Sequence, residues 1–344
     1  MRPSTRDLTT KELSLVFSMG YLLEQTINGI TLGGLYALIA LGYTMVYGIL
    51  LMINFAHAEL FMVGGYVGLG ALKLLADPAV AKAAGMGFLR PIQSFFLSGT
   101  FGYVCLIAAT FVISGIVVGL MGVFIERFAY RPLRHAPRLA PLISAIGVSI
   151  FLQNAVLVWV SSKQLPYTRV DGSAFVTSKT AFTIAGVNVS TMQVFIVATT
   201  LVLLAFLDTF VARTRMGRAM RATSQDRDAA GLMGVNINAV IALAFFIGPA
   251  LGAVAGVFNG MYYGSVKFNM GFIPGIKSFT AAVIGGIGNL RGAMLGGFLL
   301  GMVESLASGF LSNAYRDVIA FIVLVLVLIF RPGGLLGEAV AEKV

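Results

Sequence analysis

Cysteine, histidine and charged residues are all scarce in this sequence of 344 residues. Cys105 is the only cysteine, which excludes an internal disulfide and a cysteine metal cluster. The two histidines, His57 and His135, stand far apart along the chain and do not indicate a metal site. Only 11% of the residues are charged, whereas a soluble domain carries roughly 25%. A chain with so little charge needs lipid as part of its solvent.

Catalytic and nucleotide-binding motifs are missing as well. A P-loop requires GxxxxGK[ST], whose backbone amides hold phosphate. The run GFIPGIKS at 271–278 has Gly-Ile-Lys where Gly-Lys is required. The run GGIGNLRG at 285–292 has the wrong glycine spacing for a dinucleotide loop, and no strand precedes it. The sequence therefore predicts no catalytic centre, no cofactor and no metal site.

Long apolar runs fill most of the chain, and 58% of its residues are hydrophobic. Pro91 to Ile125, Leu139 to Ser162 and Ala239 to Val266 contain no charged residue. A helix needs about 20 apolar residues to cross the hydrocarbon core. The runs are continuously apolar and lack the alternation of membrane strands. We therefore predict an all-α, polytopic transmembrane helix bundle in a single domain covering residues 1–344.

We expect eight or nine spans. The first 27 residues are expected to form an interfacial helix or a short added span. Residues 271–311 fit two spans, or one span plus a re-entrant segment. The candidate spans are 28–50, 54–75, 98–125, 139–160, 190–212, 239–263, 271–289, 292–311 and 317–331.

We interpret the net charge of +10 as the result of basic loops that set the orientation of the chain in the membrane, and not as a sign of nucleic-acid binding. The segment 126–138 holds four arginines, including Arg138, and the segment 213–228 holds five. Both are expected on the cytoplasmic side, with two spans between them. The longer loop at 161–189 spreads Lys163, Arg169 and Lys179 over more residues and is expected outside, as is the connection at 77–90. With nine spans, the first span starts outside and the C-terminus lies inside.

Glycine is abundant, with 41 residues. Several glycines recur every fourth residue inside expected spans, a spacing that lets helix backbones approach closely in lipid. Two interpretations stay open: packing within one bundle, or an interface with a second membrane subunit. The candidate packing positions are Gly248, Gly252, Gly256, Gly292, Gly296, Gly297 and Gly301.

Polar residues inside spans need an explanation, because a centred charge costs roughly 2.5–3.5 kcal/mol on insertion scales. Asn54, His57 and Glu59 lie together in MINFAHAELFMVGGY. They either anchor a helix at the membrane interface, or line a pathway and fix a broken helix near it. On one helix His57 and Glu59 would point about 200° apart. Glu304 is the other candidate, and we expect it to be neutral and bonded to a serine or a backbone carbonyl.

The basic segment at 213–238 is expected to contain a short helix. Asp226 and Asp228 stand at its start, where the helix dipole favours acidic residues, and Gly234 is placed to end it. A short helix between two spans is either a docking element for a partner or only a structured loop.

Several segments are similar to a known family. Residues 28–66 read NGITLGGLYALIALGYTMVYGILLMINFAHAELFMVGGY. The other matching segments are ERFAYRPLR (126–134), LISAIGVSIFLQN (142–154), RMGRAMRA (215–222), FTAAVIGGIGNLRGAMLGG (279–297) and RPGGLLG (331–337). Together they cover nearly the whole chain, which resembles the branched-chain amino-acid ABC permeases of the LivH type.

The resemblance implies a set of partners in a bacterial inner membrane. These are a second, LivM-like permease subunit, two cytoplasmic ABC ATPase subunits and a periplasmic binding protein that delivers a small amino acid. It also implies that the segment at 215–236 couples to the ATPase. Asp228 stands where the family's coupling motif has Glu. The coupling residues carried over are Asp228, Ala229, Ala230, Gly231, Leu232 and Gly234.

The resemblance implies import of leucine, isoleucine and valine driven by ATP, with the chain itself not an enzyme. Relatives in the same superfamily serve urea and short amides, so that substrate class stays open. An ion-coupled secondary transporter using Glu59 or Glu304 is a second class of function. A passive channel is a third, and a membrane enzyme is least favoured, because no nucleophile, base and metal set converges.

Overall fold

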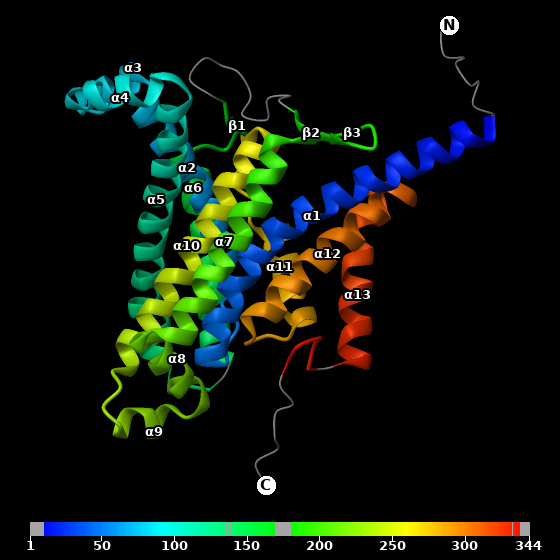
Figure 1. Ribbon diagram of the computed structural model, residues 1–344. Coiled ribbons are helices and arrows are strands. Elements are labelled where there is room, and N and C mark those ends of the chain that lie inside the picture. Colours follow the sequence, from blue (N-terminus) through cyan, green and yellow to red (C-terminus); the bar gives the residue numbers. More distant parts are fainter. Residues whose placement is uncertain (1–9, 135, 138, 169–179, 332, 338–344) are drawn as a thin grey trace, which may run out of the picture.

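The computed structural model describes residues 10–134, 136–137, 139–168, 180–331 and 333–337. Within this part of the chain, eight helical segments are long and apolar enough to cross a membrane. They form a bundle in which segments that follow one another along the chain run in opposite directions (Figure 1). The long helices are α1 (Thr10–Leu50), α2 (His57–Ala76), α5 (Gly99–Ile125), α6 (Leu139–Trp159), α7 (Thr191–Arg213), α10 (Ile237–Tyr263), α12 (Leu290–Phe310) and α13 (Arg316–Phe330).

Short elements cap both ends of the bundle. In Figure 1 the arm formed by α3 and α4 and the strands lie at one end, and α8 and α9 lie at the other. The strands form two antiparallel pairs, β1 with β4 and β2 with β3. The bounds are α3 (Pro78–Ala83), η1 (Gly87–Leu89), α4 (Arg90–Leu97), η2 (Glu126–Tyr130), η3 (Arg131–Leu133), β1 (Leu165–Pro166), β2 (Thr180–Ile184), β3 (Val187–Ser190), α8 (Arg215–Gln225), α9 (Arg227–Leu232), β4 (Ser265–Val266) and η4 (Asn313–Tyr315).

The predicted all-α membrane bundle is confirmed, and most expected spans agree with a helix to within three residues. The span expected to end at 289 ends at Gly285, and the starts of the first two spans also differ. The described residues before 28 form no separate element, because α1 runs unbroken from Thr10 to Leu50. The second span was expected from residue 54, but α2 begins at His57. Residues 1–9, His135, Arg138, Arg169 and Lys179 lie outside the described residues, so part of the orientation prediction does too.

The uncertain region 271–311 forms two helices of unequal length. Helix α11 (Phe272–Gly285) has 14 residues and is therefore about 21 Å long, shorter than the roughly 30 Å hydrocarbon core. Gly286 and Gly288 follow it with φ angles of 102° and 103°, a region that glycine adopts readily. This turn reverses the chain into α12. Gly292, in the first turn of α12, packs against Gly285.

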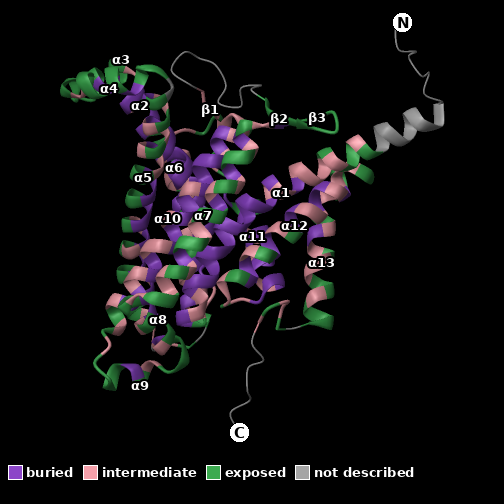
Figure 2. Cartoon of the chain, viewed as in Figure 1, coloured by how far each residue is buried: buried purple, intermediate pink, exposed green. Residues whose placement is uncertain are grey.

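Helix α1 is the centre of the bundle. It packs against α7, α10, α11 and α12, and 94% of its most apolar stretch is buried. Only 6% of the corresponding stretch of α13 is buried, and 17% of those of α6 and α7. Figure 2 shows this contrast, with buried residues concentrated in α1, α2 and α10. The exposed apolar faces of α5, α6, α7 and α13 are suited to lipid.

Glycine makes the close contacts of this core. A β-carbon at Gly256 would lie 2.1 Å from the backbone oxygen of Phe61, and one at Gly301 would lie 2.2 Å from the backbone nitrogen of Gly33. Neither site has room for a side chain, so the helix backbones approach closely there. All seven glycines singled out in the sequence lie against a neighbouring helix of this same chain: Gly248, Gly252 and Gly256 in α10, and Gly292, Gly296, Gly297 and Gly301 in α12.

Candidate functional site

A break between α1 and α2 positions the first group of polar residues. The non-helical segment runs from Leu51 to Ala56, and Leu51 has a positive φ of 53°. Asn54 is buried within this break, and its Oδ1 accepts a 2.6 Å hydrogen bond from the hydroxyl of Tyr130. Irregular backbone at membrane depth is tolerated where protein covers it, and this hydrogen bond supports such a site.

His57 begins α2 in the interior of the bundle. Its Nε2 lies 3.2 Å from the backbone oxygen of Ile39, and its ring meets Tyr43 edge-on at 4.7 Å between centroids. Ile39 lies eleven residues before the end of α1, so α2 starts beside the middle of a span and not at its end. The His57 side chain is 1% exposed, so other parts of the protein surround it.

Glu59 is also buried, with Ser149 of α6 as a hydrogen-bond partner. Its Oε2 has no hydrogen-bond partner among the described residues. A β-carbon on Gly271, at the start of α11, would lie 2.8 Å from that oxygen, so the carboxyl group abuts α11. Glu59 therefore faces α6 and α11, whereas His57 faces α1, as their spacing on one helix predicts.

Glu304 is the centre of an ion-pair cluster, which corrects the expected partners. Its Oε1 is 2.8 Å from Nζ of Lys277, contacts Nε of Arg316 and accepts a 3.1 Å hydrogen bond from Tyr36. We expected a serine hydroxyl or a backbone carbonyl instead. The two cations lie on α11 and just inside α13, which the packing of those helices against α12 brings to Glu304.

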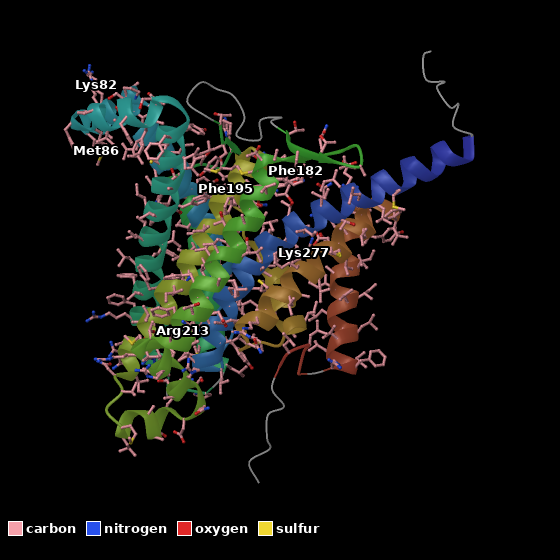
Figure 3. The ribbon with its side chains drawn as sticks, viewed as in Figure 1. Lys82, Met86, Phe182, Phe195, Arg213 and Lys277 are labelled. Atoms are coloured by element: carbon pink, nitrogen blue, oxygen red, sulfur yellow. The ribbon has the colours of Figure 1, made fainter. Side chains whose placement is uncertain are left out.

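Lys277 and Asp317 complete the cluster, and neither residue was singled out from the sequence. Nζ of Lys277 lies 2.5 Å from Oδ1 of Asp317, so the lysine joins two carboxylates. Lys277 is the only charged residue in 271–289, and an intramembrane charge requires a counter-ion. Pairing it with Glu304 would have been a justified inference. Figure 3 labels Lys277 where α1 and α12 run side by side.

The cluster borders a cavity of about 600 Å³. Its walls come from α1, α2, α10, α11 and α13, and its lining also includes Gln164 and Ser265 at the β1–β4 pair. The cavity thus lies towards the end of the molecule that carries α3 and α4, where Figure 3 labels Lys82 and Met86. Small-molecule sites are typically about 300–1,000 Å³, so the volume suits a small solute.

Aromatic side chains lie between the cavity and the α9 end of the bundle. Tyr43, one turn beyond the cavity residue Ile39, has ring contacts with His57 and with Phe279 at 5.9 Å between centroids. Phe55 meets Phe279 at 6.2 Å. This group, Tyr43, Phe55, His57 and Phe279, is called the aromatic floor below. The cavity therefore has polar lining residues towards the α3–α4 end and aromatic rings towards the α9 end.

The segment after α7 forms two short helices at the other end of the bundle, near Arg213 in Figure 3. Asp226 caps α9, its Oδ1 accepting hydrogen bonds from the backbone of Asp228 at 2.9 Å and Ala229 at 3.0 Å. Gly234 follows α9 with a φ of 83°. The short helix between Asp226 and Gly234 therefore has the ends that the sequence predicts.

Most of the α9 surface is open. Asp228, Ala229, Gly231, Leu232 and Gly234 are not buried, and Leu232 is 90% exposed. Ala230 is the exception, since it is buried against the bundle. An exposed leucine of this kind is suited to contact with another protein.

Arg227 connects α9 to α1. Its Nε and Nη2 donate hydrogen bonds to the backbone oxygen of Ile49, at 3.2 and 2.8 Å. The last carbonyls of a helix have no partner within that helix, and an arginine that bonds one of them fixes the helix end. The first residue of α9 therefore holds the end of the helix that lines the cavity.

The chain matches a known protein family over most of its length. A family profile described as the permease component of the branched-chain amino acid transport system matches residues 25–328. The chain is 46% identical over 322 residues to the high-affinity branched-chain amino acid transport system permease protein BraD of Pseudomonas aeruginosa. That alignment covers 94% of this chain and 98% of the relative.

Two further relatives carry the same description. The permease proteins LivH of Salmonella typhimurium and Escherichia coli K12 are each 44% identical, over 94% of this chain and 98% of their own length. No solved structure matches the chain. With its eight apolar segments and these relatives, the chain is a multi-pass membrane protein.

Proposed function

Because the chain belongs to the family of branched-chain amino acid transport permeases, we propose that it is the membrane-spanning subunit of an ATP-driven importer of leucine, isoleucine and valine. The observation that carries this proposal is the 44–46% identity to such permeases over 94% of the chain. A cavity of about 600 Å³ within the helix bundle supports passage of a small solute.

The proposal requires partner subunits. The sequence contains no P-loop, so ATP hydrolysis belongs to two ABC ATPase subunits on the cytoplasmic side. A second, LivM-like permease completes the membrane core, and a periplasmic binding protein delivers the amino acid. The assembly lies in the bacterial inner membrane, with the arginine-rich α8–α9 end in the cytoplasm. In this orientation the cavity lies in the periplasmic half of the bundle.

We assign ATPase coupling to α9 and its flanks, at Asp228, Ala229, Ala230, Gly231, Leu232 and Gly234. The exposed Leu232 supports docking, and the bond from Arg227 to Ile49 supports transmission to α1. The ATPase must bind the two states of the bundle with different affinities, or its cycle would shift nothing. Ala230 is buried, so it supports the helix and Leu232 makes the contact.

Reconstitution tests the proposal. The chain is placed in proteoliposomes with the second permease, the ATPases and the binding protein, and uptake of labelled leucine is measured. We expect uptake that requires both ATP and the binding protein. Uptake of urea or a short amide in place of leucine would move the chain to the alternative substrate class, and uptake by the chain alone would contradict the importer.

A second candidate is an ion-coupled transporter, and the unpartnered Oε2 of the buried Glu59 favours it. The variant Glu59→Gln separates the two functions. Under the importer proposal the variant retains ATP-dependent leucine uptake. ATP hydrolysis then drives uptake, and the Glu59 carboxyl group does not have to carry a proton or an ion. Loss of uptake, together with dependence of wild-type uptake on an ion gradient, would favour the second candidate.

A further inference from the structure

The walls of the cavity carry an excess of positive charge. Lys267, Lys277 and Arg316 line it, whereas Asp317 is the only acidic residue among its described lining residues. Glu304 lies behind the wall, fully buried, and does not line the cavity. The negative charge of Glu304 offsets one of the three cations, and Asp317 offsets a second. The cavity surface therefore keeps a net positive charge that attracts a carboxylate.

The two carboxylates that hold Lys277 differ in exposure. The side chain of Lys277 is 3% exposed and that of Glu304 is 0% exposed, so this 2.8 Å pair is fixed within the protein. The side chain of Asp317 is 53% exposed, and it reaches the same Nζ from the first turn of α13 at 2.5 Å. Asp317 is therefore the partner of Lys277 that water and solutes can replace.

The rest of the cavity offers an apolar surface of the size an aliphatic side chain needs. Ile39, Phe61, Met270 and Ile273 line it together with the charged wall. Ile39 and Phe61 are 1% exposed, so the surrounding protein holds these two lining side chains in place. One cavity thus combines a cation, an acid and apolar surface, the three groups that recognise an aliphatic α-amino acid.

We propose that this cavity binds the transported amino acid as a zwitterion. Lys277 binds the carboxylate of the amino acid in place of Asp317, and the released Asp317 binds its ammonium group. The aliphatic side chain packs on Ile39, Phe61, Met270 and Ile273. The inference rests on the proposed function, because it concerns the solute that the permease passes.

Exchange of partners keeps this binding weak. The amino acid breaks the pair between Lys277 and Asp317 and forms one new pair with each of them, so each charge has a partner before and after. An exchange of this kind yields little net electrostatic free energy. A low affinity suits a site that must release its solute to the cytoplasm.

Photolabelling of the complete assembly in proteoliposomes tests the site directly. The probe is a leucine analogue with a diazirine in its side chain, and the labelled peptides are identified by mass spectrometry. We expect labels in residues 32–39, 61 or 265–277, and competition by leucine. 3-Methylbutylamine lacks the carboxylate and 4-methylpentanoate lacks the amine, so neither should compete. Labelling elsewhere, or equal competition by either analogue, would overturn the proposal.

Two variants add a matched comparison. Asp317→Asn should abolish the preference for leucine over 4-methylpentanoate, because Lys277 is then free for either carboxylate and the ammonium group of leucine has no carboxylate partner. Asp208→Asn is the same chemical change in α7, outside the cavity, and should leave competition unchanged. Since Asp317 is half exposed, its replacement does not threaten folding. Equal competition in both variants would remove Asp317 from the site.

The uptake assay separates this inference from the proposed function. Normal ATP-dependent leucine uptake by the wild-type assembly, with labels that avoid the cavity, overturns the zwitterion site alone. Absence of ATP-dependent leucine uptake by the wild-type assembly overturns the proposed function, whatever the labels show.

Discussion

Glu304 has the role of a fixed counter-ion for two cations. It is fully buried and contacts both Lys277 and Arg316. Removal of one partner from a buried ion pair leaves an uncompensated charge, which costs far more than loss of a pair at the surface. Loss of Glu304 would therefore destabilise the protein mainly because it would leave buried positive charge without a counter-ion.

The variant Glu304→Gln should lower the free energy of unfolding by about 3–5 kcal/mol, because Lys277 would then keep only Asp317 and Arg316 would lose its carboxylate partner. Thermal unfolding of the purified protein in detergent measures this change. The control is Asp208→Asn, which removes the partner of Arg291, a side chain that is 71% exposed and well hydrated. We expect a much smaller loss there, and similar melting temperatures in both variants would contradict the assignment.

Alanine substitutions at Gly256 and Gly147 test whether close helix packing depends on a single glycine. Gly256→Ala should destabilise the protein by about 1–3 kcal/mol, because its β-carbon would meet the Phe61 backbone oxygen at 2.1 Å. Gly147 lies in the middle of α6, and a β-carbon there would meet no atom within 4 Å, so Gly147→Ala should be neutral or slightly stabilising. Melting temperatures of the two variants give the comparison. Equal destabilisation would show that helix spacing is not set at Gly256.

At the scale of elements, α9 and α1 form one connected unit through Arg227 and Ile49. Arg227→Met keeps the aliphatic stem and removes both hydrogen bonds. We expect ATP hydrolysis to continue while leucine uptake falls about tenfold, because the movement of α9 no longer reaches α1. Both rates are measured in proteoliposomes.

Arg218→Met is the matched control for that variant. Arg218 lies exposed on α8, and its side chain bonds to the nearby backbone oxygen of Arg213, at 3.4 Å. It should retain coupling between hydrolysis and uptake. If both variants couple normally, transmission does not run through the end of α1.

Helix positions were predictable from the sequence because lipid imposes long apolar segments. The expected span at 190–212 agrees with α7 (Thr191–Arg213), whose start has a capping box of Ser190 and Gln193. The early end of α11 at Gly285 was not predictable, because apolar residues continue beyond it and only the glycine turn stops the helix. The arm of α3 and α4 was also missed, since it is too short to produce a membrane signal.

The site was less predictable than the fold. Asn54, His57, Glu59 and Glu304 stood out as polar residues in apolar runs, but their partners come from distant segments. Glu304 and Tyr36 are 268 positions apart, and no spacing rule relates them. Lys277 was overlooked in its short apolar context, although its charge required a partner.

At the scale of the whole molecule, the orientation can be tested through the single cysteine. Cys105 is replaced by serine, and one new cysteine is placed at Ser224 in α8 or at Lys82 in α3. A membrane-impermeant maleimide should label Lys82→Cys from outside and Ser224→Cys only in inverted vesicles, because the arginine-rich end lies inside. The reverse pattern would invert the bundle and turn the cavity towards the cytoplasm.

The central place of α1 has a consequence for synthesis. This helix leaves the ribosome long before α12, along which it packs and which begins 240 positions after residue 50, at Leu290. At translation rates of about 5–20 residues per second, α1 waits roughly 10–50 s for that neighbour. During this time Gly29 and Gly33 face lipid or another protein where Met302 and Phe298 will later pack. Helix α1 is thus synthesised long before the neighbour that covers these glycines, so the nascent α1 is a suitable substrate for a chaperone in the membrane.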